Sequence, residues 1–181
     1  MSNSDQSWFA IRVKSRCEWA VSDALRQKGY EEFLPLYWSR RRWSDRVKVL
    51  QLPLFSGYLF CRFAAADRVP ILSTPGVVLI VGSGKTPLPI EAKEVEAIRV
   101  AVNSGQKIVP WPHLEIGRTV RIEEGSLRGL EGVLLRFKGT NQLIVGVQLL
   151  QRAVAVEMPE HWVIPARSST AVASAGGTAS L

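Results

Sequence analysis

The chain has 181 residues, of which 46% are hydrophobic and 22% are charged. This length allows one large domain or two small ones, each with its own core, and the composition argues against global disorder. Lys and Arg number 23 against 16 Asp and Glu, so the formal net charge of +7 favours a polyanionic neighbour such as nucleic acid or an acidic protein surface.

Two cysteines and two histidines argue against a disulfide framework and against a metal cluster. Residues 1–7 lack a basic leader segment, and no apolar run reaches the ~18 residues that a membrane helix requires. We therefore expect a monomeric cytoplasmic protein with no membrane segment, no metal and no cofactor.

The first hundred residues predict alternating strands and helices. From Trp8 to Lys14 a strand is predicted, with the large apolar residues Phe9, Ile11 and Val13 on one face and Ala10, Arg12 and Lys14 on the other. Ser15 and Glu18 have the spacing of a capping box that starts a helix, and Gly29 is placed to end it. The further elements expected are a strand at 33–37 interrupted by Pro35, a long strand at 53–63, a fully buried strand at 77–81 and an amphipathic helix at 91–102. This order predicts an α+β sandwich with helices over a sheet.

The composition then changes. Residues 115–166 contain short β-rich runs split by glycine, which is typical of a small all-β barrel. The tail is almost entirely Ser, Thr, Ala and Gly, so we expect it to be disordered. The predicted organisation is a first domain at 1–105, a linker at 106–114, a barrel at 115–166 and a tail at 167–181.

The sequence offers little support for an enzyme. The segment from Gly82 to Thr86 resembles part of a phosphate-binding loop, but Leu79 stands where the first glycine is needed and Pro87 prevents a following helix. The two histidines do not combine with a serine and an aspartate into a triad, and no paired carboxylates stand out. We therefore predict a binding protein.

A basic segment at 38–48 carries five cations and one anion between aromatic residues. Guanidinium groups pair with phosphates and aromatic rings stack on bases, so this segment favours nucleic-acid contact over a merely solvated hairpin. The nucleic-acid-binding candidates are Lys14, Arg16, Lys28, Arg40, Arg41, Arg42 and Arg46.

An aromatic run at 53–63 alternates between two apolar faces. One face carries Leu59, Cys61 and Phe63, and the other carries Tyr58, Phe60 and Arg62. One face can serve the core, and the second needs either covering helices or a protein partner.

These segments resemble the NusG/RfaH family of transcription elongation and antitermination factors. Residues 8–14, 33–37 and above all 53–60 are similar to its N-terminal (NGN) domain, and residues 117–122 with 129–133 are similar to a KOW motif. The resemblance covers about residues 7–166 and implies an NGN sandwich followed by an SH3-like KOW barrel. The basic segment, and Ser56 where the family has proline, favour a specialised paralogue.

The resemblance implies binding to RNA polymerase. The family's NGN domain docks on the clamp helices of the β′ subunit, bridges the cleft towards the β subunit, and suppresses pausing or termination close to non-template DNA and nascent RNA. Carried over to this chain, the polymerase-binding residues are Leu54, Phe55, Tyr58 and Phe60. We expect this surface to be open to water in the free protein, and burial of its rings beneath the protein's own helices would overturn this docking assignment.

The resemblance also implies that the KOW barrel recruits a small-subunit ribosomal protein or the termination factor Rho, here through Leu127, Leu150 and Arg152. The β-branched runs at 143–147 and 154–156 predict a stable barrel, without the helical hairpin that masks the NGN domain in RfaH. The alternative is an RNA-binding or ribosome-associated KOW module that acts without polymerase. Residues 105–181 carry 8 cations and 6 anions, against 15 and 10 in residues 1–104, which argues against that alternative.

Overall fold

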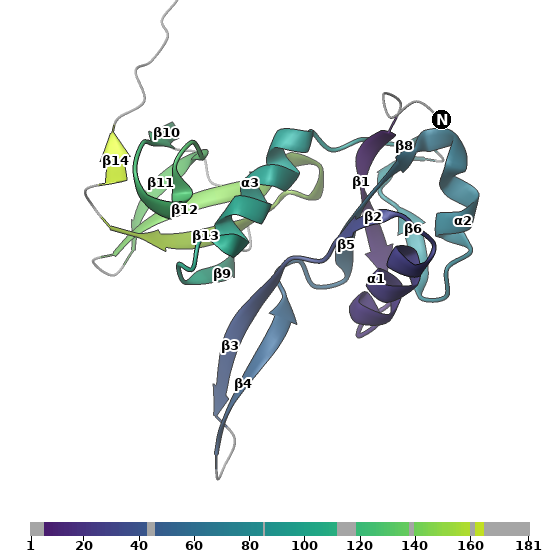
Figure 1. Ribbon diagram of the computed structural model, residues 1–181, viewed down its shortest axis with the longest axis horizontal. Coiled ribbons are helices and arrows are strands. Elements are labelled where there is room, and N and C mark those ends of the chain that lie inside the picture. Colours follow the sequence, from purple (N-terminus) through teal and green to yellow (C-terminus); the bar gives the residue numbers. More distant parts are fainter. Residues whose placement is uncertain are drawn as a thin grey trace, which may run out of the picture.

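The computed structural model describes residues 6–42, 46–84, 86–111, 119–137, 140–159 and 162–164, and it confirms the predicted α+β class (Figure 1). The predicted tail at 167–181 and linker residues 112–114 lie outside the described residues. The first sheet is antiparallel, in the order β2-β5-β1-β6. Its strands are β1 (Gln6–Val13), β2 (Glu31–Phe33), β5 (Tyr58–Ala64) and β6 (Val77–Ile80).

Helices cover both faces of the first sheet. On one face, α1 (Glu18–Gln27) and α2 (Arg68–Leu72) pack on apolar residues such as Phe9 and Leu59. On the other face, α3 (Ala92–Asn103) packs on Trp8 and Phe60. The alternation predicted for β1 and β5 is therefore confirmed, with both faces of each strand buried.

Helix α1 starts differently from the prediction. Cys17 is its N-cap residue and makes no side-chain hydrogen bond, so the expected capping box is wrong. The buried Glu18 carboxylate instead accepts a hydrogen bond from the backbone N–H of Gly57, at 2.9 Å. The helix ends at Gly29 as predicted, because Gly29 adopts a left-handed φ of +84°.

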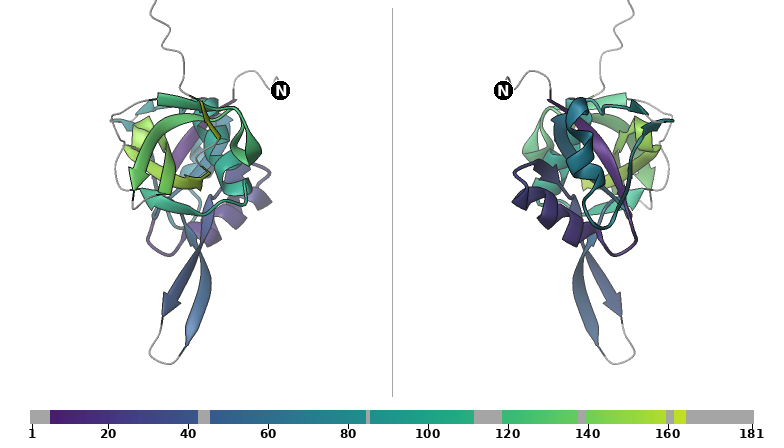
Figure 2. Two further views of the ribbon diagram at one scale, coloured as in Figure 1. Left: turned by 90° about the vertical axis from the view of Figure 1, so that its left-hand side faces the viewer. Right: turned by 90° about the vertical axis from the view of Figure 1, so that its right-hand side faces the viewer.

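Two predicted strands are divided at turn residues. Pro35 separates β2 from β3 (Leu36–Arg42), and β3 pairs with β4 (Val47–Pro53) as a separate two-stranded sheet. The predicted long strand at 53–63 is broken by a turn in which Gly57 has a φ of +80°. β3 and β4 thus form a hairpin that projects away from the rest of the molecule (Figures 1 and 2).

The segment after α2 differs from prediction in one respect. β6 lies at the edge of the sheet and exposes Val78 and Leu79, so the expectation of a fully buried strand is wrong. The chain then forms the short antiparallel pair β7 (Gly82–Ser83) and β8 (Thr86–Pro87). A phosphate-binding loop would need a helix at the position of β8. Helix α3 agrees with its predicted range within one residue.

The second sheet has six strands in the order β14-β10-β11-β12-β13-β9 and curls into a barrel (Figure 2). Its elements are β9 (Ile108–Trp111), β10 (Thr119–Ile122), η3 (Gly125–Leu127), β11 (Glu131–Phe137), β12 (Thr140–Val147), η4 (Gln148–Leu150), β13 (Arg152–Met158) and β14 (Val163–Ile164). β9 pairs with β13, so residues 108–111, predicted as linker, belong to the barrel sheet.

The two sheets share one hydrophobic core through α3. A single cluster of buried residues runs from Trp8 and Phe60 in the first sheet, through Ile98 in α3, to Leu127 and Val145 in the barrel. Helix α3 therefore packs against both parts of the molecule (Figure 1). Within the part of the chain that the structure describes, no helix combines the length and apolar character needed to cross a bilayer.

Candidate functional site

The aromatic patch, which we define as Leu54, Phe55, Tyr58 and Phe60, is built by the turn before β5 and by the first residues of that strand. The backbone N–H of Tyr58 donates to the Phe55 carbonyl at 2.9 Å and closes the turn. The rings of Phe55 and Phe60 meet edge to face with centroids 5.5 Å apart.

The aromatic patch is covered in this structure. Phe55 is 1% exposed and Phe60 is 0% exposed, while Leu54 is buried and Tyr58 is half-buried. The expectation of a surface open to water is therefore wrong. The physical reason is that α3 and the barrel of the same chain supply apolar side chains to the cluster that contains these rings.

Barrel residues make direct polar contacts across this interface. The Arg152 guanidinium lies 5.0 Å from the centroid of the Tyr58 ring, and its Nη1 donates to the Ser56 carbonyl at 3.3 Å. The backbone N–H of Gln148 donates to Oε1 of Glu94 on α3, at 3.2 Å. Burial raises the pKa of the Glu94 carboxyl, because its effect outweighs that of the Gln148 hydrogen bond, which lowers the pKa. The Glu94 carboxylate is therefore partly shielded from water at this contact.

The three predicted partner-binding residues of the barrel lie on the side that packs against the first domain. Leu127 in η3 is fully buried, and Leu150 in η4 is half-buried against the same core. Arg152 contacts the aromatic patch directly. The structure therefore brings the predicted polymerase-binding and partner-binding surfaces face to face.

A groove of about 460 Å³ opens at the edge of this interface. Tyr37, near the root of the β3–β4 hairpin, and Arg41, near its tip, line it from β3, Phe55 lines it from the aromatic patch, and Trp111 and Arg152 line it from the barrel. Glu94, Gln148 and Trp111 were not among the sequence candidates. Only tertiary packing brings them to this interface, and no motif in the sequence marks them.

The nucleic-acid candidates divide into two groups by element. Arg40, Arg41, Arg42 and Arg46 are exposed on the β3–β4 hairpin, whereas Lys14 and Arg16 are exposed between β1 and α1. Residues 43–45, at the tip of the hairpin, lie outside the described residues.

Lys28 has a structural contact of its own. Its Nζ donates to the Pro70 carbonyl at 2.8 Å and to Oγ1 of Thr74 at 2.7 Å. The side chain therefore connects the end of α1 to α2, and it is less available to a phosphate than an exposed arginine.

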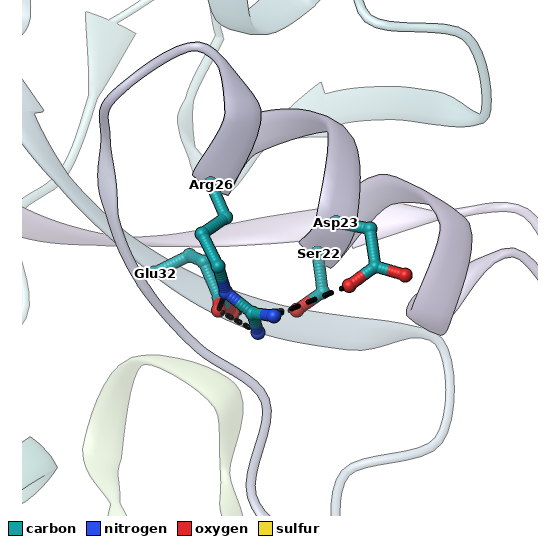
Figure 3. Close-up of polar contacts among 4 residues, drawn as sticks. All are labelled: Ser22, Asp23, Arg26 and Glu32. Atoms are coloured by element: carbon teal, nitrogen blue, oxygen red, sulfur yellow. Dashed lines mark hydrogen bonds and ion pairs between the residues drawn. The ribbon is translucent and has the colours of Figure 1, made fainter.

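A polar cluster of four residues connects α1 to β2 (Figure 3). Arg26 donates to the Glu32 carboxylate through Nε at 2.9 Å and through Nη2 at 2.5 Å, and it also pairs with Asp23 at 3.3 Å. The Ser22 hydroxyl donates to the other Glu32 oxygen at 2.6 Å. These contacts satisfy the Arg26 guanidinium within the protein.

Comparisons with known proteins agree with this architecture. The family model described as transcription termination factor NusG matches residues 6–99. The transcription termination/antitermination protein NusG of Neisseria meningitidis serogroup B is 35% identical over 167 residues, covering 84% of this chain and 94% of that protein. The Campylobacter jejuni protein of the same name is 26% identical and covers 86% and 94%. A solved structure on domain interaction in Thermotoga maritima NusG shares the fold, with a TM-score of 0.57, 18% identity, and coverage of 91% of this chain and 99% of that one.

Two features of the chain now agree. The family model matches residues 6–99, which form the first sheet and its helices, and the match to the Neisseria protein extends over most of both chains. The chain therefore belongs to the NusG family of transcription termination/antitermination factors.

Proposed function

We propose that this protein binds the β′ clamp helices of RNA polymerase through its aromatic patch and suppresses pausing or termination without catalysing a reaction. Helix α3 and the barrel both cover the patch in the free chain, which counts against direct docking, so docking requires these elements to move away first. The observation that carries this proposal is the opposed placement of the aromatic patch and the barrel loops around Arg152.

Docking would exchange apolar contacts within the chain for apolar contacts with the polymerase. The rings of Phe55 and Phe60 would lose the apolar cover that α3 and the barrel supply and gain contacts with the polymerase, so most of the apolar area stays out of water. The apparent affinity is then the intrinsic affinity reduced by the fraction of open molecules. A closed chain binds weakly until the polymerase, or another partner, selects the open form.

Opening would release a second surface at the same time. Leu127, Leu150 and Arg152 leave the interface together with the barrel, and we assign them to the recruitment of a small-subunit ribosomal protein or of Rho. Docking of the first domain and recruitment by the barrel are thereby coupled, because one movement exposes both sites.

Exposed cations would hold nucleic acid beside the polymerase. The β3–β4 hairpin, with Arg40, Arg41, Arg42 and Arg46, is the main candidate for contact with non-template DNA or nascent RNA, and Lys14 and Arg16 form a smaller second group. We give Lys28 the least weight, because its ammonium group already has two oxygen partners. Such exposed charges contribute mainly to association rate and salt dependence.

A pull-down with core RNA polymerase tests the docking assignment. Tyr58→Ala removes a half-buried ring of the patch, whereas Arg41→Ala removes an exposed cation. We expect the tyrosine variant to lose at least about tenfold more binding, because buried aromatic residues dominate interfaces. Thermal unfolding of both variants checks that each is folded, and cross-link mapping locates the contact. Equal binding by wild type and Tyr58→Ala would reject the assignment.

A further inference from the structure

We propose that the β3–β4 hairpin inserts into the major groove of duplex DNA. This inference rests on the nucleic-acid contact proposed above and specifies its ligand. Each strand has seven residues, which at ~3.4 Å per residue gives a ribbon of roughly 24 Å. The ribbon is a two-stranded sheet of its own and projects from the body of the molecule (Figures 1 and 2).

The strand register sorts the charged side chains onto two faces. Residues paired across an antiparallel ladder share a face, and neighbours along a strand alternate. Arg40 is paired with Val49 and Arg42 with Val47, so both arginines lie on one face. Arg41 is paired with Lys48 on the opposite face. The ribbon therefore presents two exposed cations on each side.

Cations on both faces of the ribbon favour binding inside a groove, where phosphates lie on both sides, over binding to a flat surface. A ribbon lying on a single phosphate backbone would use one face and leave the other cations in water. The major groove of B-DNA, about 12 Å wide, admits a two-stranded β-ribbon between two rows of phosphates. The deep, narrow major groove of an RNA duplex does not. The two-sided charge thus points to duplex DNA.

The face that carries Arg40 and Arg42 also exposes apolar side chains. Trp38, Val47 and Val49 are 68%, 61% and 53% exposed and share the face of Arg40 and Arg42. Apolar side chains in the major groove contact the methyl groups of thymine. A protein partner would also cover such side chains, but residues 36–53 contain five cations and one carboxylate in the sequence, which favours a polyanion.

The test uses the full chain and three labelled probes: a 20-base-pair DNA duplex, one of its single strands, and the RNA duplex of the same sequence. Fluorescence anisotropy is measured at several salt concentrations. One variant removes the first pair of cations (Arg40→Ala with Arg42→Ala), and another removes the opposite pair (Arg41→Ala with Lys48→Ala). The matched control, Arg68→Ala with Arg128→Ala, removes two exposed cations from other elements.

Insertion predicts that both hairpin variants bind the DNA duplex at least about tenfold more weakly and that the salt slope falls by about 2 in each, since each lost phosphate contact lowers it by about 0.9. The control changes little, and the duplex DNA binds more tightly than the other two probes. A loss confined to one face, or equal binding of single strands or RNA, overturns the inference. Weaker polymerase binding by the hairpin variants with unchanged DNA affinity also overturns it and identifies a protein contact. The DNA assay contains no polymerase, so it is independent of clamp docking.

Discussion

Glu18 illustrates how one buried carboxylate positions the aromatic patch. Its side chain leaves the first turn of α1 and accepts the N–H of Gly57, in the turn that carries Phe55 and leads to Tyr58. Without this acceptor, the Gly57 N–H would lose its side-chain partner in a largely buried turn. The residue is therefore a link between the helix and the patch, and not the capping residue that its spacing from Ser15 suggests.

Replacing Glu18 tests this role. We expect Glu18→Ala to lower the free energy of unfolding by about 1–3 kcal/mol, the cost of leaving a buried donor unsatisfied. Glu18→Gln keeps an acceptor oxygen and should lose less. Urea denaturation followed by circular dichroism measures both variants. If the two substitutions cost the same, the hydrogen bond to Gly57 does not carry the effect.

Arg152 has the most direct polar contact between the barrel and the patch. Removing its contacts with Tyr58 and Ser56 should raise the open fraction, since an exposed cation–π contact and an exposed hydrogen bond are each worth about 0.5 kcal/mol, or about fivefold together. We expect Arg152→Ala to bind core RNA polymerase about 3–10-fold more tightly in surface plasmon resonance. Arg128→Ala, which removes an exposed barrel cation, is the control. Unchanged or weaker binding by Arg152→Ala would show that this contact does not restrain docking.

At the scale of elements, periodicity predicted most helices and strands but not where turns divide them. The alternation around Phe60 identified both buried faces of β5, because alternation depends only on the local pleat. The division at Pro35 and the turn at Gly57 depend on which strand supplies the next pairing partner. The burial of Phe55 depends on an element distant in sequence, the barrel, so no local pattern contains it.

The barrel strands pair among themselves, which makes a prediction about the isolated element. β9 to β14 form one continuous sheet that contains no strand from the first sheet. We expect a fragment of residues 106–181 to keep strand chemical shifts in NMR, matching those of the full chain. Its β-branched residues at 143–147 and 154–156 favour this state. Predominantly helical shifts would refute a stable barrel and indicate a change of fold on release.

In the whole molecule, the barrel and α3 cover the aromatic patch, so the two surfaces that we propose for binding face each other. The sequence predicted both surfaces through the family resemblance, but it placed the aromatic patch in water. The shared core around Ile98 shows why this failed: α3 offers apolar side chains to both sheets, and a closed chain buries more apolar surface than an open one. In the proposed mechanism, the packing that stabilises the fold would also control access to the patch.

The most direct test is to cross-link α3 to the barrel reversibly and to measure polymerase binding with and without the link. Glu94→Cys with Gln148→Cys places one thiol on α3, at the residue whose carboxylate accepts the hydrogen bond between α3 and the barrel, and one in η4, at the residue whose backbone N–H donates it, in a Cys17→Ser background. Burial raises the pKa of Cys61 to about 12, so the buried Cys61 should stay unreactive. A bismaleimide with a reducible disulfide spacer joins the pair, and binding to core RNA polymerase is measured before linkage, after it, and after reduction. The account predicts that linkage abolishes binding and that reduction restores it. Equal binding by the linked and unlinked protein would contradict it.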